Sequence, residues 1–300
     1  MHLTRTEKLG MLYALLGVFL FSLSLPMTKW ALESFDPFLT ASSRPIFASM
    51  IAIPLMLFVK VKKVPKQYLK PLIYTMLGNA FVWPVLIALA LHRTTSAHIA
   101  VISSIMPLST AIFAVMRTKT QVSWQFWAAS ISGTALLVIF SISRGGGSGG
   151  DLIADALTLG AVIASAYCYV EGAELTKIMP GWQVISWVVV LALPICIPGS
   201  LFIWSQTHAQ HTITVHGLVG ITMIGVSSMY LGFFAWYRGL KDAGTAHGSQ
   251  VQQLQGIMTL GWAALLLGEK VTLPMIAISL GVILCVLWAL MSRQRTLEMS

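Results

Sequence analysis

The sequence predicts an all-α membrane protein with ten transmembrane helices, arranged as two inverted five-helix repeats. Of its 300 residues, 56% are hydrophobic and only 10% are charged, whereas a soluble domain carries about 25% charged residues. The apolar residues lie in blocks of roughly the 20 residues that cross a bilayer as a helix. A glycine-rich segment divides these blocks into two groups of five.

The apolar blocks define the expected helices in chain order. In the first group, the expected helices cover residues 9–32, 38–59, 68–91, 95–116 and 122–142. In the second group, they cover residues 152–176, 182–204, 216–238, 245–267 and 273–291. Most connections between the blocks are too short to hold a further domain.

The middle of the chain is expected to be a flexible linker, because residues 143–151 are mostly glycine and serine. Residues 1–142 then form the first repeat, and residues 152–300 form the second repeat with a short cytoplasmic tail. The glycines have no lysine-serine ending and follow no strand, so they do not form a phosphate-binding loop.

The two halves resemble each other in sequence. Residues 95–98 (Thr-Ser-Ala-His) recur as residues 244–247 (Gly-Thr-Ala-His), a shift of 149. The same shift places residues 103–104 opposite 252–253, and Pro107 opposite Gly256. Since each half has an odd number of spans, the second copy is inverted across the membrane, as in many secondary transporters.

The basic residues predict the orientation in an inner membrane. If the N-terminus is inside, 14 of the 19 Lys and Arg residues lie on the cytoplasmic side, as the positive-inside rule requires. Both termini are then cytoplasmic. The net charge of +9 reflects topology and contact with membrane lipid, and no nucleic-acid partner is implied. Arg5 and Lys8 before an apolar run also fit a signal peptide, but the run is long and lacks a clear cleavage site.

The polar chemistry of enzymes and metal sites is missing from the sequence. The three cysteines, Cys168, Cys196 and Cys285, lie inside apolar blocks without a CxxC pattern, so we interpret them as buried hydrophobic residues. No metal cluster, nucleophile triad or cofactor motif is found, and we expect no metal, no cofactor and no catalytic residue.

Two basic residues fall within predicted spans. Lys29 and Arg44 lie near the outer ends of the first and second helices, and a charge within a membrane usually faces a cavity or a partner. We interpret them as a charged gate that attracts an anionic group of the substrate. The alternative is that they extend to the lipid headgroups or pair with Glu33 or Asp36.

The ninth predicted helix has the densest run of polar residues. At 100° per residue, Gln252 and Gln253 share one face with Ser249, while Gln250 lies roughly opposite. Amides facing lipid are costly, so this face is expected to line a substrate cavity together with the repeat mates Ser103 and Ser104. The alternative is hydrogen bonding between helices that only holds the bundle together.

Further polar and aromatic residues at mid-membrane depth complete the predicted binding site. They are Asn79 and Trp83 in the third helix, Tyr167 in the sixth and Tyr230 in the eighth. A planar ligand could stack among them, although each residue taken alone also fits ordinary core packing.

Prolines and histidines suggest motion and coupling. Pro26, Pro84 and Pro107 lie inside predicted helices, where proline frees a backbone carbonyl, and we interpret them as hinges; tolerated kinks are the alternative. His98 and His247 are repeat mates that titrate near neutral pH and are candidates for proton coupling. Glu171 and Glu174, late in the sixth helix, are candidates for the same role.

Four local patterns resemble a known family. They are Phe-Ser-Leu-Ser-Leu-Pro-Met-Thr-Lys at residues 21–29, proline at 37 followed by arginine at 44, Pro107, and Leu-Leu-Leu-Gly-Glu at residues 265–269. In order and spacing, over residues 9–291, they resemble the drug/metabolite transporter superfamily, specifically its EamA-type ten-helix carriers. Thr120 and Gly256 depart from the family pattern, which usually has glutamate and proline there.

The resemblance implies a secondary transporter that exports a small metabolite, such as an amino acid, by alternating access through a central polar and aromatic cavity. The first helix contains no mid-span acidic residue, unlike the small multidrug carriers, which argues against a lipophilic-cation substrate. The coupling ion stays open. A membrane-embedded enzyme and a non-transporting scaffold or receptor are the alternatives, but the first would need an acid/base or metal constellation and the second would not need matched polar faces.

Overall fold

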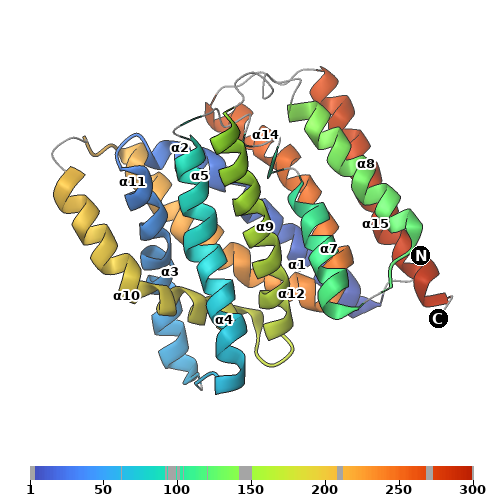
Figure 1. Ribbon diagram of the computed structural model, residues 1–300, viewed down its shortest axis with the longest axis horizontal. Coiled ribbons are helices and arrows are strands. Elements are labelled where there is room, and N and C mark those ends of the chain that lie inside the picture. Colours follow the sequence, from blue (N-terminus) through green and yellow to red (C-terminus); the bar gives the residue numbers. More distant parts are fainter. Residues whose placement is uncertain are drawn as a thin grey trace.

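The computed structural model describes residues 4–61, 63–91, 93, 99, 102–103, 105–119, 121–141, 151–207, 212–267 and 273–298. Every regular element within these residues is a helix (Figure 1). Each of the ten predicted spans contains at least one of these helices. Five of the spans are continuous enough and apolar enough to cross a membrane by length and composition: Arg5–Ala31, Pro37–Val59, Leu152–Leu175, Gly181–Thr207 and Val215–Ala243.

In the first half, the spans are built from eight described elements. They are α1 (Arg5–Ser22) and α2 (Ser24–Ala31); α3 (Pro37–Val59); α4 (Leu69–Met76), η2 (Leu77–Val82) and α5 (Trp83–Leu91); α7 (Met106–Thr118); and α8 (Trp124–Ser141). A short 3₁₀ turn, η1 (Lys66–Tyr68), precedes α4. The predicted linker residues 143–150 lie outside the described residues, and Asp151 after them caps the next helix through the amide N–H groups of Ile153 and Ala154.

In the second half, the spans follow the same order. They are α9 (Leu152–Leu175); α10 (Gly181–Thr207); α11 (Val215–Met223), η5 (Ile224–Gly232) and α12 (Phe233–Ala243); α13 (Thr245–Ser249), η6 (Gln250–Gln253) and α14 (Leu254–Leu267); and α15 (Leu273–Glu298). The fold class predicted from the sequence is confirmed.

Polar side chains cap the first turns of α1 and α3. Thr4 and Glu7 form a capping box at α1, and Asp36 accepts hydrogen bonds from two amides at the start of α3.

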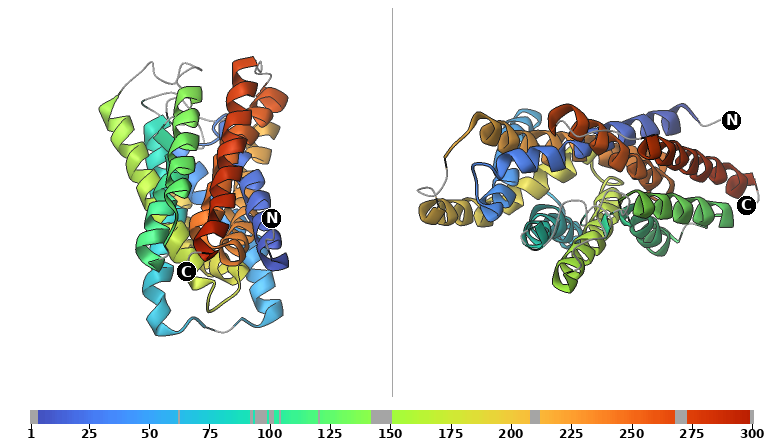
Figure 2. Two further views of the ribbon diagram at one scale, coloured as in Figure 1. Left: turned by 90° about the vertical axis from the view of Figure 1, so that its right-hand side faces the viewer. Right: turned by 90° about the horizontal axis from the view of Figure 1, so that it is seen from above.

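α1 begins and α15 ends at the same end of the molecule (Figures 1 and 2). We call this end of the bundle, which the sequence predicts to be cytoplasmic, the N face.

The closest packing joins the first and eighth spans. A Cβ at Gly10 would lie 2.6 Å from the backbone nitrogen of Ala243, and a Cβ at Gly239 would collide with the backbone of Ala14. Small residues allow two helix backbones to approach in this way. At the other edge of the bundle, α8 and α15 lie side by side in both views of Figure 2.

Two helices are widened at matching places in the repeats. The third span contains the π-helical η2, and the eighth contains the π-helical η5. π segments often occur at functional sites, because they break the regular backbone ladder. Here η2 contains Asn79, and η5 contains Ser228 and Tyr230, so the irregular backbone coincides with buried polar side chains.

The first span is broken at Leu23, between α1 and α2. Pro26 has no N–H, so it cannot donate to the carbonyl of Ser22 four residues earlier. That carbonyl accepts a hydrogen bond from Thr259 Oγ1 at 3.1 Å, and Ser22 Oγ accepts one from Trp262 Nε1 at 2.9 Å. The side chains of α14 therefore satisfy the polar groups at this break.

In the ninth span, the predicted position of Gln250 relative to Gln252 and Gln253 is wrong. The sequence placed Gln250 roughly opposite Gln252 and Gln253, but Gln253 Nε2 donates to Gln250 Oε1 at 2.7 Å. The reason is that Gln250–Gln253 form a 3₁₀ helix, in which residues three apart lie directly above one another.

Candidate functional site

A buried arginine lies at the centre of the site. Arg44 of α3 is only 9% exposed, and its Nη2 donates to Ser228 Oγ of η5 at 3.1 Å. Its Nε has no hydrogen-bond partner, and no carboxylate of the described residues pairs with it. A buried charge without a counter-ion is costly, so Arg44 marks a place where an anion would be stabilised.

A tyrosine and an amide lie next to this arginine. Tyr169 of α9 is close enough to Arg44 for the two side chains to interact electrostatically. The Tyr169 side chain also lies against the Gln252 amide, whose Nε2 donates to Met106 Sδ at 3.2 Å. Gln252 Oε1 lacks a hydrogen-bond partner, as does Arg44 Nε. The cluster therefore contains an acceptor without a donor and a donor without an acceptor.

Aromatic rings surround Tyr169. Its ring stacks on Phe21 at a centroid distance of 6.4 Å and meets Phe233 and Trp236 edge-on at 5.7 and 5.8 Å. Phe21 also contacts Phe233 edge-on at 4.9 Å. These side chains come from α1, α9 and α12, so both halves of the chain contribute to one apolar wall.

A second buried polar pair lies beside this wall. Asn79 Nδ2 of η2 donates to Tyr237 Oη of α12 at 2.8 Å, while Asn79 Oδ1 has no partner. Tyr237 contacts Phe233 at 5.5 Å, which connects this pair to the aromatic wall. Asn79 thus provides a second unused acceptor.

Together these residues offer the chemistry of a binding site. The cluster combines an arginine donor, two amide acceptors and aromatic faces, which suit a small molecule with an anionic group and hydrogen-bond donors. No group of three or more His, Cys, Asp or Glu side chains that could hold a metal ion is found among the described residues.

Comparison with known proteins supplies the family. The model of the EamA-like transporter family matches residues 8–142 and 152–292. The chain belongs to the EamA-like transporter family. It is 36% identical over 277 residues to a protein named "Uncharacterized transporter YdeK" from Bacillus subtilis (strain 168), covering 92% of this chain and 95% of that protein.

A solved crystal structure has the same fold as this EamA-like chain. It superposes with a TM-score of 0.79 at 14% sequence identity, covering 95% of this chain and 98% of the other. The family match and the 36% identical relative confirm the resemblance predicted from the sequence, and the chain is a multi-pass membrane transporter of this family.

Within this EamA-like fold, the two basic residues that were predicted to form a gate lie in different environments. Arg44 belongs to the buried cluster, whereas Lys29 is exposed in the last turn of α2. Glu33 and Asp36, their alternative partners, instead contact His216 at 3.7 Å and cap α3.

The predicted binding residues are only partly brought together. Asn79 and Gln252 join the cluster around Arg44. Tyr230 is buried near it on η5 and shares a hydrogen bond with Ser186 of α10 at 2.8 Å. Gln253 is buried toward α8, where its Oε1 fills the space that a Cβ at Gly133 would need.

The remaining predicted positions differ in how they relate to this cluster. Trp83 is half-buried and packs against the hydrophobic core that includes Tyr169, and also against the apolar contact of α5 with α9. Ser103 is half-buried with an unpartnered Oγ, while Ser104 and His98 lie outside the described residues. His247 is buried against the Phe126 ring at 4.8 Å, and its coupling role stays a prediction.

The predicted hinges lie at irregular points of the EamA-like helices. Pro26 follows the break at Leu23, Pro84 is the second residue of α5 after η2, and Pro107 lies in the first turn of α7. Motion at these points stays a prediction.

Sequence reasoning chose Tyr167 on α9 and missed Tyr169, which lies in the cluster. Tyr167 instead contacts Tyr74 at 6.2 Å and Phe113 at 5.9 Å. A buried stripe along α9 could have identified Tyr169, because Thr158, Val162, Ser165 and Tyr169 recur at intervals of three and four residues. Ser228 and Tyr237 had no comparable signal.

Proposed function

We propose that this EamA-like transporter is a secondary carrier of a small carboxylate-bearing metabolite, such as an amino acid, moved outward by alternating access. The observation that supports this most is the buried Arg44, which has one hydrogen bond to Ser228 and no carboxylate partner among the described residues. A substrate carboxylate would supply the missing counter-charge through a charge-assisted hydrogen bond.

The unused acceptors favour a zwitterion. Asn79 Oδ1 and Gln252 Oε1 are buried without hydrogen-bond donors, and an ammonium group supplies three donors. An apolar or aromatic substrate side chain would pack against Phe21 and Phe233. An amino acid presents all three features in one molecule.

The irregular helices support alternating access. Polar residues of the cluster lie on η2 and η5, which are repeat mates by position in the chain. In transporters built from inverted repeats, discontinuous helices typically form the central site, and the repeats rock against each other around it. The coupling ion or exchanged solute is left to experiment, with His98 and His247 as the candidates for proton coupling.

The first test is a counterflow screen in proteoliposomes, followed by Arg44→Gln with Lys29→Gln as the matched control. A charged hydrogen bond contributes about 1.5–3 kcal/mol, so Arg44→Gln should raise the apparent KM for the carboxylate substrate about tenfold or more. Because Lys29 is exposed, its replacement should change KM little. An equal loss for a carboxylate substrate and its neutral amide would contradict the proposal.

We further propose an inner-membrane location with both termini and residues 60–70 in the cytoplasm and residues 144–151 outside. Single cysteines at Val64 and Gly147 in a cysteine-free background test this assignment. An impermeant maleimide added to intact cells should label Gly147→Cys only. Labelling of Val64→Cys under the same conditions would reverse the orientation.

A further inference from the structure

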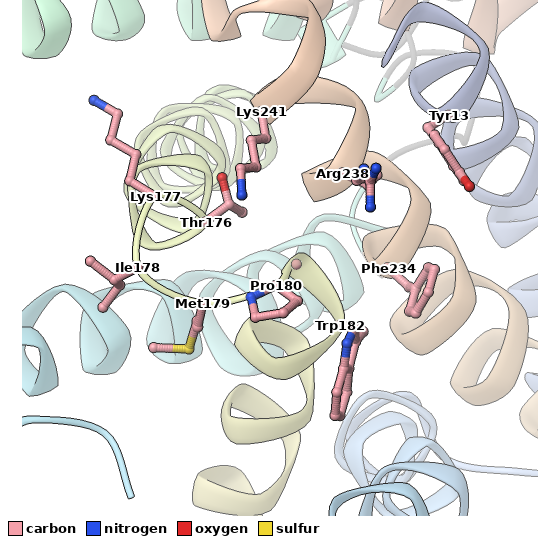
Figure 3. Close-up of a pocket in the computed structure, with 11 residues that line it drawn as sticks. Tyr13, Thr176, Lys177, Ile178, Met179, Pro180, Trp182, Phe234, Arg238 and Lys241 are labelled. Atoms are coloured by element: carbon pink, nitrogen blue, oxygen red, sulfur yellow. The ribbon is translucent and has the colours of Figure 1, made fainter. Parts of the chain in front are cut away.

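Figure 3 shows a second polar site, whose lining does not include Arg44. It is a pocket of about 300 Å³ where the turn between α9 and α10 meets α1 and α12. The side chains that matter for its chemistry are Tyr13, Lys177, Trp182, Phe234, Arg238 and Lys241.

The pocket is basic, and its cations differ in how far they are already paired. Lys177 Nζ binds Glu174 at 2.6 Å and points away from the pocket in Figure 3. Arg238 binds Asp242 through Nε at 2.6 Å and lies over the Tyr13 ring at 5.5 Å, which leaves its terminal nitrogens available. Lys241 is exposed and has no ion pair with any described residue.

The Lys241 ammonium points toward Pro180 in Figure 3, and Arg238 lines the same pocket. The same turn leads into α10, which has no acidic residue in its first turn. Helix N-termini carry partial positive charge, so this end adds to the field of the two side chains. The pocket is therefore suited to a compact anion such as a phosphate group.

The surroundings favour a phosphate that belongs to a lipid. Trp182 is a half-buried aromatic residue in the first turn of α10, as is typical of the membrane interface, and the half-buried Tyr13 lies in the middle of α1. The pocket lining also includes Ile178, an apolar side chain that is 42% exposed. An anion pocket with an exposed apolar side chain in its lining matches a headgroup with an acyl chain.

We propose that this pocket binds an acidic phospholipid, with Lys241 and Arg238 holding its phosphate and one acyl chain lying against Ile178. Basic pockets between helices on the cytoplasmic side are known places for anionic headgroups. The lipid would connect α1 and α12 to the turn between α9 and α10, and would so stabilise the N face. This inference does not depend on what binds at Arg44.

The test uses the purified full chain in a neutral detergent with increasing dioleoyl phosphatidylglycerol, and measures the temperature of half-aggregation. Dioleoyl phosphatidylethanolamine and glycerol 3-phosphate are the comparison ligands, for a zwitterionic lipid and a free phosphate. Phosphatidylglycerol should stabilise the wild type most. Lys241→Gln should need about five times more of it for the same effect, while Lys241→Arg should behave as wild type.

Lys66→Gln is the matched control, because Lys66 is an exposed cation on the same face outside the pocket. It should leave the response to phosphatidylglycerol unchanged. A loss as large as that of Lys241→Gln would show general surface charge instead of a site. Equal stabilisation by glycerol 3-phosphate, or an unchanged response of Lys241→Gln, would also overturn the proposal.

Discussion

Two helix junctions are related by the repeat but are held by different chemistry. The fourth and sixth spans meet where Arg117 Nε of α7 donates to Glu171 Oε1 of α9 at 2.7 Å. Their repeat mates, the ninth and first spans, meet where Trp262 and Thr259 of α14 donate to Ser22 of α1. The first junction is an ion pair near the N face, and the second consists of neutral hydrogen bonds further from that face.

The sequence shift of 149 makes the contrast specific. It places Phe113 opposite Trp262 and Arg117 opposite Leu266. Phe113 packs edge-on against Tyr167 of α9 at 5.9 Å, and Trp262 packs edge-on against Phe19 of α1 at 5.4 Å. The aromatic contact is thus common to both junctions, whereas the charge belongs to one of them. Only that junction should respond to the loss of a counter-ion.

The largest effect is expected from Arg117→Met. The Glu171 side chain is only 4% exposed, and its hydrogen-bonding partners are Arg117 and Tyr167, so the change leaves a buried carboxylate without its counter-ion. Loss of one partner of a fully buried pair costs about 3–5 kcal/mol. Because Arg117 is 48% exposed, we expect about 2 kcal/mol, measured as reduced thermal stability in detergent.

The double variant Arg117→Met with Glu171→Gln is the control for this prediction. It removes both charges and should recover most of the lost stability, because a neutral glutamine side chain needs no counter-ion. If the double variant were as unstable as Arg117→Met alone, the arginine would act through its packing and not through its charge.

A smaller effect is expected at the neutral junction from Trp262→Phe. This change keeps an aromatic ring against Phe19 but removes the Nε1–H that donates to Ser22 Oγ. A neutral hydrogen bond contributes about 0.5–1.5 kcal/mol, so we expect a loss of about 1 kcal/mol. Trp262→Phe and Ser22→Ala should be clearly less than additive in a double-mutant cycle, and full additivity would mean that the bond contributes nothing.

The ten spans could be predicted from the sequence because a bilayer imposes a length on every apolar helix. The side chains that face the centre were harder to predict. A transmembrane helix is apolar toward lipid as well as toward its neighbours, so periodicity distinguishes the two faces poorly. Tyr169 and Tyr167 are two residues apart on one apolar helix, and only the spacing of Tyr169 from Thr158 and Ser165 along α9 separates them.

Charges within the spans were the better guide to the site. Arg44 was singled out by its position, and it lies at the centre of the buried cluster. Lys29 was singled out by the same reasoning, but it lies in the last turn of α2, where its long side chain reaches the surface. Gln250 could not be placed because the change from α to 3₁₀ geometry at Gln250–Gln253 depends on tertiary packing.

The smallest effect, and the most specific, is expected from Thr259→Val. This nearly isosteric change removes the hydroxyl that donates to the Ser22 carbonyl, and hydrogen bonds between membrane helices contribute about 0.6 kcal/mol on average. The carbonyl needs that donor because Pro26 cannot supply a backbone N–H. In a Pro26→Ala background, the new N–H of residue 26 can donate to Ser22, so Thr259→Val should then cost almost nothing. Thermal stability of the four proteins in one detergent measures this coupling. An identical loss with and without Pro26 would mean that Thr259 acts independently of the broken helix, and the first span would then be broken at Leu23 for some reason other than its proline.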